Sequence, residues 1–402
     1  MKTEIIIDDI DRAAQIIAAG GLVAVPTETV YGLAANGLDE CAVHRIYEVK
    51  GRPEVKPLAL MVAGADAMDE YCAPVPPQAR LLVEKFWPGP LTIVMQAKDT
   101  VPNIVRAGGT TVGLRCPAHE LTLAALKAAK LPFAAPSANP SGEASPKNAH
   151  TVLAYFDGKI DAVIDGGECG IGHESTLIDM SAAPYKILRQ GALDRGAIAD
   201  ALAEGVTIVG ITGGTGSGKT TALNTLAELG ALVIDCDALY HELLHTDAGL
   251  VAAIDAKFPG AVIDGAVDTK ALGRIVFADE VKLQALNELT RGFILNAVHE
   301  RVCDHAMRGG TLAAIDAIEL FSSGAADMCN VTFGVIADRE VRLARIQQRD
   351  NISREYAELR VSAQHPDEYF IAHCDHILHN NGTKEEFSDC CMKIFTEVLK
   401  NE

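Results

Sequence analysis

The sequence lacks an apolar run of the roughly 20 residues that a membrane-spanning helix needs, so we expect no membrane contact. Its ten cysteines form no C-x-x-C pair, which in a chain of 402 residues is typical of reduced thiols in a cytosolic protein. The start of the chain turns acidic at Asp8 and Asp9, too early for a signal peptide. These absences predict a cytoplasmic globular protein.

Positive charge is also scarce, because 54 Asp and Glu residues outnumber 35 Lys and Arg residues and give a net charge of −19. Such a chain repels polyanions at long range. Any contact with a nucleic acid would therefore need a local basic patch. We expect the positive charge to be clustered wherever phosphate groups bind.

A phosphate-binding loop is present near the midpoint, where residues 213–220 read GGTGSGKT and fit G-x-x-x-x-G-K-[ST]. An apolar run at 206–211 predicts a strand before it, and 221–229 predicts a helix after it. Backbone N–H groups of such a loop surround phosphate oxygens. Lys219 can reach the β- and γ-phosphates, and the Thr220 hydroxyl can bind Mg²⁺. The expected nucleotide-binding residues of the loop are Gly213, Gly214, Thr215, Gly216, Ser217, Gly218, Lys219 and Thr220.

A loop of this kind usually opens its domain, so residues 1–205 and 206–402 are predicted to be separate domains. A helix at 194–204, with Asp194 as its N-cap and Gly205 ending it in the left-handed conformation, is expected to close the first domain. The first half contains many short strands with irregular helical spacing, which predicts a twisted mixed α/β sheet. The second half alternates strands with helices, which predicts a parallel α/β domain.

Basic and polar loops in the first half are candidates for a site. Lys50, Arg52 and Lys56 lie in a stiff Gly/Pro-containing loop, and Ser137 and Asn139 lie in a proline-framed turn. Each alone is equally compatible with an ordinary surface loop. Arg189 ends a predicted strand.

Together and in this order, these segments resemble the YrdC-type threonylcarbamoyl-AMP synthases over residues 5–204. The segments that carry the resemblance are PTETVYGL (26–33), KGRP (50–53), WPGPLT (87–92), VGLRCP (112–117), PSAN (136–139), STLID (175–179) and LRQG (188–191).

The resemblance implies that L-threonine, bicarbonate and ATP give threonylcarbamoyl-AMP and pyrophosphate, the former being the donor for threonylcarbamoyladenosine in tRNA. The tRNA-modifying machinery is then an expected partner. Lys50, Arg52, Lys56 and Arg189 would offset the triphosphate charge, with Lys50 and Arg52 catalytic, and Ser137 and Asn139 would bind phosphate or ribose. Thr27, Tyr31 and Ser175 would line the threonine pocket, although Tyr31 is equally compatible with a core aromatic residue whose hydroxyl is satisfied.

The second half resembles dephospho-CoA kinases over residues 206 to about 400. The matching segments are GITGGTGSGKT (210–220), VIDCD (233–237), GRIVFAD (273–279), Arg345, Arg349 and NNG (380–382). The implied reaction moves the γ-phosphoryl group of ATP to the ribose 3′-hydroxyl of dephospho-CoA.

In that reaction Asp237 would orient or deprotonate the hydroxyl group, while Lys219 and the lid residues Arg345 and Arg349 would hold the γ-phosphate. Asn380 belongs to the expected nucleotide site. Asp316, which ends an apolar strand, is a candidate for substrate or Mg²⁺ binding, and a strand-end charge or helix cap is the alternative.

The acceptor side departs from this family's pattern. The expected D-x-P-L-L-[FY]-E reads DAIELFS at 316–322, so that Ile318 and Ser322 replace the proline and the glutamate, and Arg291-Gly292 replaces a usual His-Pro pair. The run of His365, His373, Cys374, His376 and His379 fits no familiar structural zinc spacing, and we interpret it as surface and strand-end residues.

The sequence therefore predicts a bifunctional enzyme that uses ATP and Mg²⁺ in both halves. The alternatives are a synthase with a degenerate, ATP-binding kinase module, and an RNA-binding adaptor that uses the first domain.

Overall fold

Short apolar runs form two large sheets in this computed structural model, which describes residues 2–400 and also contains a two-stranded hairpin. The chain divides into two units, one made of residues up to Gly205 together with Met307–Gly309 and one made of the remaining residues. Among the described residues, no helix combines the length and the apolar character that a membrane crossing requires.

The first unit contains a mixed sheet with the strand order β1-β8-β2-β3-β7-β4-β6-β5-β9-β10. Neighbours such as β4 and β6 run parallel, whereas β5 and β6 run antiparallel. The strands are β1 (Glu4–Ile6), β2 (Val23–Val25), β3 (Gly32–Asn36), β4 (Ala59–Met61), β5 (Leu91–Gln96), β6 (Thr111–Arg115), β7 (Phe133–Ala134), β8 (Ala162–Ile164), β9 (Thr176–Asp179) and β10 (Lys186–Arg189). The predicted mixed α/β sheet is confirmed.

Eight helices surround this sheet in the described part of the first unit. They are α1 (Ile10–Ala18), α2 (Glu40–Lys50), α3 (Ala67–Tyr71), α4 (Pro77–Phe86), α5 (Asn103–Arg106), α6 (Glu120–Ala129), α7 (Ala149–Phe156) and α8 (Arg195–Ala203). Asp194 caps α8 as expected, since its side chain accepts a hydrogen bond from the Gly196 N–H. The left-handed ending expected at Gly205 is wrong, because its φ is not positive and its neighbour Glu204 is right-handed. Gly205 instead gives room to Leu81, whose Cδ1 would lie 2.4 Å from a Cβ at that position.

The second unit contains a five-stranded sheet with the order β12-β15-β11-β16-β17, in which every pair is parallel. The strands are β11 (Thr207–Thr212), β12 (Leu232–Asp235), β15 (Leu312–Asp316), β16 (Val331–Ile336) and β17 (His376–His379). Every residue of β16 is buried, as expected of a central parallel strand covered on both faces. The predicted parallel α/β fold of this half is confirmed.

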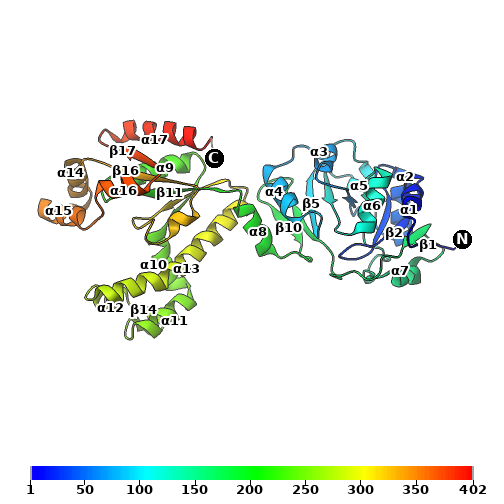
Figure 1. The fold of residues 1–402 in the computed structure, drawn as a ribbon, viewed down its shortest axis with the longest axis horizontal. Helices are drawn as coiled ribbons and strands as arrows, with labels where there is room; N and C mark the ends of the chain where they lie inside the picture. Colours follow the sequence, from blue (N-terminus) through cyan, green and yellow to red (C-terminus); the bar gives the residue numbers. More distant parts are fainter. Residues whose placement is uncertain (1, 401–402) are drawn as a thin grey trace. The chain divides into compact units, whose positions relative to one another are not determined.

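Helices and a small hairpin complete the second unit. They are α9 (Lys219–Glu228), α10 (Cys236–Thr246), α11 (Ala248–Lys257), the hairpin β13 (Val262–Ile263) and β14 (Ala266–Val267), α12 (Thr269–Val276), α13 (Glu280–Met307), the 3₁₀ turn η1 (Ala325–Met328), α14 (Arg339–Asp350), α15 (Arg354–Ser362), α16 (Asp367–His373) and α17 (Lys384–Val398). Helices α9 and α17 lie side by side over the sheet (Figure 1) and bury Leu226 and Phe395 against Phe333. The Phe333 and Phe395 rings meet edge to face with centroids 5.0 Å apart.

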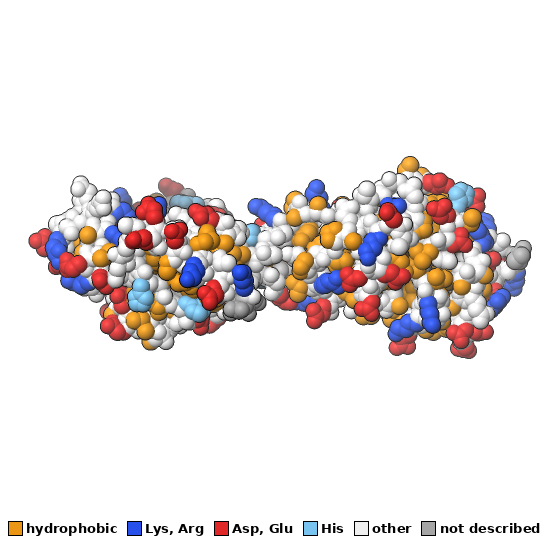
Figure 2. Space-filling view, turned by 90° about the horizontal axis from the view of Figure 1, so that it is seen from above, with side chains coloured by type: hydrophobic (Ala, Val, Ile, Leu, Met, Phe, Trp, Pro, Cys, Tyr) orange, Lys and Arg blue, Asp and Glu red, His pale blue; other side chains and the backbone are white. Residues whose placement is uncertain are grey.

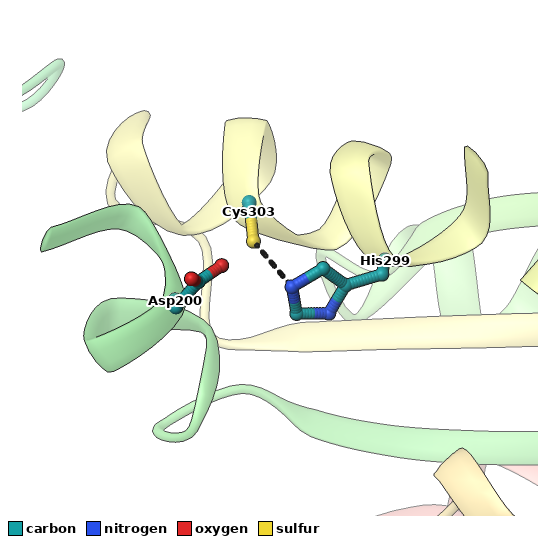
Figure 3. Close-up of side chains that lie close together, drawn as sticks. All are labelled: Asp200, His299 and Cys303. Carbon is teal, nitrogen blue, oxygen red and sulfur yellow. Dashed lines mark hydrogen bonds between the residues drawn. The ribbon is translucent and has the colours of Figure 1, made fainter. Parts of the chain in front are cut away.

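The ten cysteines are all free thiols. On α13 the Cys303 Sγ lies 3.4 Å from the Nε2 of His299, one helical turn away (Figure 3). On the face drawn in Figure 2, Lys and Arg side chains alternate with Asp and Glu side chains. On such a surface, a Lys or Arg side chain that has no Asp or Glu partner differs from its surroundings.

The N-terminus of α17 carries a reciprocal cap, because Thr383 Oγ1 accepts from the Glu386 N–H at 3.2 Å and Glu386 Oε2 accepts from the Thr383 N–H at 2.9 Å. We predict that Thr383→Ala lowers the free energy of unfolding of the second unit by about 1 kcal/mol. Calorimetric melting of the full chain would measure this loss of stability. Trp87 lies in the first unit, so the melting transition that its fluorescence does not follow is that of the second unit. Thr396→Ala, the same change at an exposed position of the same helix, should shift that transition by less than about 0.5 kcal/mol, and equal shifts would contradict the capping role.

Candidate functional sites

A cavity of about 320 Å³ opens on the sheet of the first unit, with walls from β3, β4, β5, β6, β9 and β10 and from the loops at their ends. Its floor is made of small or apolar residues, namely Gly32, Ala59, Met61, Thr92, Val94, Thr111, Gly113 and Leu177. Its polar wall contains Arg52, Arg115, Ser137, Glu174, Ser175, Asp179 and Arg189. The cavity thus gathers three arginines and two carboxylates, and its use as a phosphate site stays a prediction.

Two of these arginines are held by neutral oxygen atoms. Arg52 donates to the carbonyl oxygens of Lys56 at 3.3 Å and Pro57 at 3.0 Å. Arg189 donates from Nη2 to the Ser175 carbonyl at 2.8 Å and to the Ser175 Oγ at 3.2 Å. Because carbonyl and hydroxyl oxygens carry no net charge, these hydrogen bonds do not cancel the charge of either guanidinium group, although the Glu174 carboxylate in the same cavity interacts with Arg189.

The third arginine, Arg115, was not among the predicted site residues. Its side chain is only 7% exposed and donates to Glu28 Oε1 at 2.7 Å and to Thr29 Oγ1 at 2.8 Å. The Glu28 Oε2 also accepts from the Ala118 N–H at 3.0 Å, so the carboxylate is fixed on both sides. One feature of the sequence could have predicted Arg115 as a site residue. It is a charged residue at the end of the buried strand β6, and such a residue needs a partner or a function.

Two predicted serines reach the cavity. Ser137 lies on its wall, and the Ser175 Oγ lies 2.8 Å from the Thr92 Oγ1.

Tyr31 also contributes to the wall, but its hydroxyl group donates to the Gly167 carbonyl at 2.9 Å and accepts from the Gly166 N–H at 3.1 Å. Burial raises the pKa of Tyr31 to about 12. The hydroxyl group of Tyr31 is therefore satisfied by the protein itself.

Four other predicted residues do not line the cavity. Thr27 is fully buried, and its Oγ1 closes a turn by donating to the Val30 carbonyl at 2.6 Å. Lys56 is exposed outside the cavity. Asn139 lies behind the wall with its amide oxygen buried and without a hydrogen-bond partner. These three residues lie outside the cavity walls, and their predicted binding roles stay predictions.

Lys50 is the fourth and is 4% exposed. Its Nζ donates to the carbonyl oxygens of Ser137 and Asn139, and its own carbonyl accepts from the Ser141 N–H at 2.8 Å. Burial and the nearby Arg52 lower the pKa of Lys50 to about 7. Lys50 thus holds the Ser137–Ser141 turn from behind instead of facing the cavity.

The phosphate-binding loop of the second unit connects β11 to α9, which begins at Lys219. Gly213, Gly216 and Gly218 have φ values of 141°, 81° and 108°, which residues with a side chain rarely adopt. Lys219 donates from Nζ to the Gly213 carbonyl at 2.9 Å across the mouth of the loop. The Ser217 Oγ is buried without a partner, whereas Thr220 is exposed.

Carboxylates from neighbouring strands face this loop. Asp316 at the end of β15 lies in register with Asp235 of β12 and Ile211 of β11. Burial raises the pKa of Asp316 to about 6, and its Oδ1 is buried without a partner. Burial lowers the pKa of Lys219, while Asp316 and Asp237 oppose that shift. Lys219, Asp237 and Asp316 therefore share one electrostatic site, as parallel strands that end at the same edge require.

The two predicted lid arginines bind other groups of the protein in this structure, and their role at the γ-phosphate stays a prediction. Arg345 donates to the Asn380 carbonyl and to its Oδ1, both at 3.1 Å, and Asn380 donates to the Ser217 carbonyl at 2.7 Å. Arg349 is exposed and makes a two-pronged ion pair with Asp350 at 2.7 and 2.9 Å. Arg345 supports the back of the loop because α14 packs there, and Arg349 is held by its chain neighbour.

Arg342 was missed, although it shares a helical face with Arg345 and Arg349 at spacings of three and four residues. It is 4% exposed and donates to the Thr215 carbonyl at 3.1 Å. The spacing was the signal that could have found it.

Two protein families match this chain. A Sua5/YciO/YrdC model, described as "Telomere recombination", matches residues 15–191, and the dephospho-CoA kinase model matches residues 207–386. A threonylcarbamoyl-AMP synthase of Pyrococcus abyssi is 49% identical over 45% of this chain and 53% of its own length. A threonylcarbamoyl-AMP synthase of Halorhodospira halophila is 33% identical over 43% of this chain and 91% of its own length. A dephospho-CoA kinase of Geobacter sulfurreducens is 37% identical over 45% of this chain and 93% of its own length.

The chain belongs to both families. It spans about half the length of the Pyrococcus abyssi synthase. The predicted membership of the two halves is confirmed.

The departures from the kinase pattern lie beside Asp316. Ser322 donates to Glu319 Oε2 at 2.5 Å, and the same oxygen lies 3.5 Å from His365 Nε2. Arg291 occupies the space beside Gly324, where a Cβ would lie 1.9 Å from its Nη2. The acceptor side of this kinase domain therefore has a different set of polar side chains from the family pattern.

The histidines near the C-terminus behave as structural residues. The His365 ring stacks on Tyr369 at 3.9 Å, and His376 stacks on Phe333 at 5.0 Å. His365, His373, Cys374, His376 and His379 do not converge on a common point that could hold a metal ion, within the residues that the structure describes.

The buried pair of Glu28 and Arg115 gives a prediction for the synthase domain. Arg115→Gln leaves the Glu28 carboxylate buried without its cation, so the first unit should lose about 3–5 kcal/mol of unfolding free energy. Urea unfolding followed by the fluorescence of Trp87 measures this unit.

The double variant Glu28→Gln/Arg115→Gln is the matched control, since it removes both charges and should recover most of that loss. A double variant as unstable as the single one would show that the ion pair is not the cause.

Proposed function

We propose that the chain is a bifunctional enzyme in which residues 1–205 form threonylcarbamoyl-AMP from L-threonine, bicarbonate and ATP, and residues 206–402 phosphorylate the 3′-hydroxyl group of dephospho-CoA with ATP. The observation that carries the proposal is the presence of two separately built anion sites, the arginine-rich cavity of the first unit and the glycine loop of the second. Each lies in the half that belongs to the corresponding family. The adenylate product would then be a donor for tRNA modification.

The cavity suits a reaction that needs alignment and charge stabilisation. N-carboxythreonine carries its own nucleophilic carboxylate, so the protein has to bring that carboxylate to the α-phosphate and stabilise the charge on the triphosphate. Arg52 and Arg189 are available for the triphosphate because neutral oxygens hold them. Ser175 offers a hydroxyl group for the threonine, and Arg115, whose charge is paired with Glu28, lines the same cavity.

The Ser137–Asn139 turn supports the same proposal from the other wall. Ser137 offers a hydroxyl group to the cavity, and the buried, unpartnered Asn139 Oδ1 lies behind it. A buried acceptor without a partner is costly unless a donor fills it in some state. We assign this turn to the nucleotide, with Lys50 as the residue that holds it.

The second site suits phosphoryl transfer. Lys219 and the loop N–H groups would bind the β- and γ-phosphates, and Asp237 would receive or orient the acceptor hydroxyl group. The unpartnered Asp316 Oδ1 and the exposed Thr220 hydroxyl group fit a divalent cation, and Mg²⁺ bound there would neutralise phosphate charge. Arg349 would have to leave Asp350 to reach the γ-phosphate.

The drifted acceptor side supports a second candidate, a synthase with a kinase domain that only binds ATP. Ile318, Ser322 and Arg291 replace residues of the family pattern in that region. Product analysis separates the two candidates.

Purified full chain with Mg-ATP should release pyrophosphate only when threonine and bicarbonate are present, and ADP and CoA only when dephospho-CoA is present. Lys219→Ala removes the cation at the β- and γ-phosphates, so it should lower CoA formation at least about 100-fold and leave pyrophosphate release unchanged. Chromatography of the nucleotide products measures both reactions in one sample. Loss of pyrophosphate release in Lys219→Ala would contradict the two-site arrangement, and absence of CoA in the wild type would favour the second candidate.

The raised pKa of Asp316 predicts the pH dependence of the kinase reaction. Its carboxyl group is protonated below about pH 6 and cannot then serve a cation or the acceptor. The kcat/KM for Mg-ATP, which reports the site before a cation binds there, should therefore fall about tenfold per pH unit below about pH 6 and level off above it. The Asp316→Asn variant should be slow, and its kcat/KM should not fall below pH 6. If the fall at low pH is unchanged in this variant, another group causes it.

A further inference from the structure

Thr215 is the third residue of the glycine loop. All three of its polar groups are bound by two side chains from the segment 339–373. Its N–H donates to Gln364 Oε1 at 2.7 Å, and Gln364 Nε2 donates to the Thr215 Oγ1 at 2.7 Å. Its carbonyl accepts from Arg342 Nε at 3.1 Å. Neither Gln364 nor Arg342 belongs to the phosphate-binding motif.

These contacts form a connected, partly buried network around the buried side chain of Arg342. Arg342 is 4% exposed, donates from Nη2 to Gln364 Oε1 at 3.3 Å and pairs through Nη1 with Asp367 at 3.4 Å. The two side chains that hold Thr215 therefore also hold each other. A buried polar network with every member satisfied makes a structure rigid, whereas removal of one member leaves its partners unpaired.

The glycines on both sides of Thr215 are shaped to this network. A Cβ at Gly214 would lie 2.1 Å from Arg342 Nη2, and a Cβ at Gly216 would lie 2.9 Å from the Arg342 carbonyl oxygen. Gly216 also has a φ of 81°. Gly214 and Gly216 stand at variable positions of the motif, and Arg342 packs closely against both. The backbone contact and the positive φ favour glycine at position 216 in addition to any approach of a phosphate.

We infer that Gln364 and Arg342 are positioning residues that hold the glycine loop in its phosphate-binding conformation before the nucleotide arrives. Gly213, Gly216 and Gly218 all adopt positive φ, so a free loop of this composition would sample many other conformations. Fixing Thr215 at its N–H, its carbonyl and its hydroxyl group removes that freedom in advance and lowers the entropy lost on binding. The inference rests on the proposed function only in that a nucleotide occupies this loop.

The test is the affinity of the full-length chain for Mg-ADP, measured by titration calorimetry with the signal of Lys219→Ala subtracted to remove the contribution of the first unit. Gln364→Leu leaves the Thr215 N–H unpaired and should weaken Lys219-dependent binding about tenfold. Thr215→Val should weaken it about threefold, and Thr215→Ser, which keeps the hydroxyl group, should restore the wild-type affinity. Gln348→Leu, the same change at an exposed position of α14, should have no effect.

Steady-state kinetics distinguish positioning from general stabilisation. Loss of positioning raises the KM for ATP and leaves the KM for dephospho-CoA unchanged, whereas a structural role alone lowers the melting temperature and leaves the affinity of the folded protein intact. Wild-type affinity for Mg-ADP in a folded Gln364→Leu variant would overturn the inference. Absence of Lys219-dependent binding in the wild type would instead overturn the proposed nucleotide site, and with it this role.

Discussion

Hydrogen bonds from cationic side chains to backbone carbonyl oxygens are the interaction on which both sites depend. Arg52 and Arg189 in the first unit, and Lys219 and Arg345 in the second, all donate to carbonyl groups. A carbonyl oxygen fixes the direction of the side chain without cancelling its charge. In a chain with a net charge of −19, this arrangement leaves Arg52 without a hydrogen-bonded carboxylate in the cavity and directs Lys219 to the glycine loop, while Arg345 supports that loop from behind.

Cations elsewhere in the chain are treated differently. Arg80 pairs with Asp69 and Arg354 pairs with Glu340, and such exposed ion pairs neutralise themselves and contribute little to stability. Arg115 lies between these two classes, because it lines the cavity and also pairs with the buried carboxylate of Glu28. Burial makes that pair a strong orienting device, since neither charge is tolerated alone.

The fold and part of each site could be predicted from the sequence because the relevant signals are local. Apolar runs marked the strands, and the GGTGSGKT segment marked the glycine loop with Lys219 at the start of its helix. The placements that could not be predicted depend on contacts between distant segments. Arg52 lines the cavity, whereas Arg345 lies behind the glycine loop, although both are arginines. Lys50 is buried under a turn about 90 residues away in the sequence. No local sequence pattern predicts these placements. Arg342 is different, because its helical spacing to Arg345 and Arg349 could have predicted its place beside the glycine loop.

The central claim is that one chain carries two nucleotide sites, each built by its own unit. The most direct measurement is the binding stoichiometry of an ATP analogue with a non-hydrolysable α,β-linkage, by equilibrium dialysis with saturating L-threonine and Mg²⁺ and without dephospho-CoA. The account predicts two molecules of analogue per wild-type chain and one per Lys219→Ala chain. A single site in the wild-type chain, or no change on replacing Lys219, would contradict it.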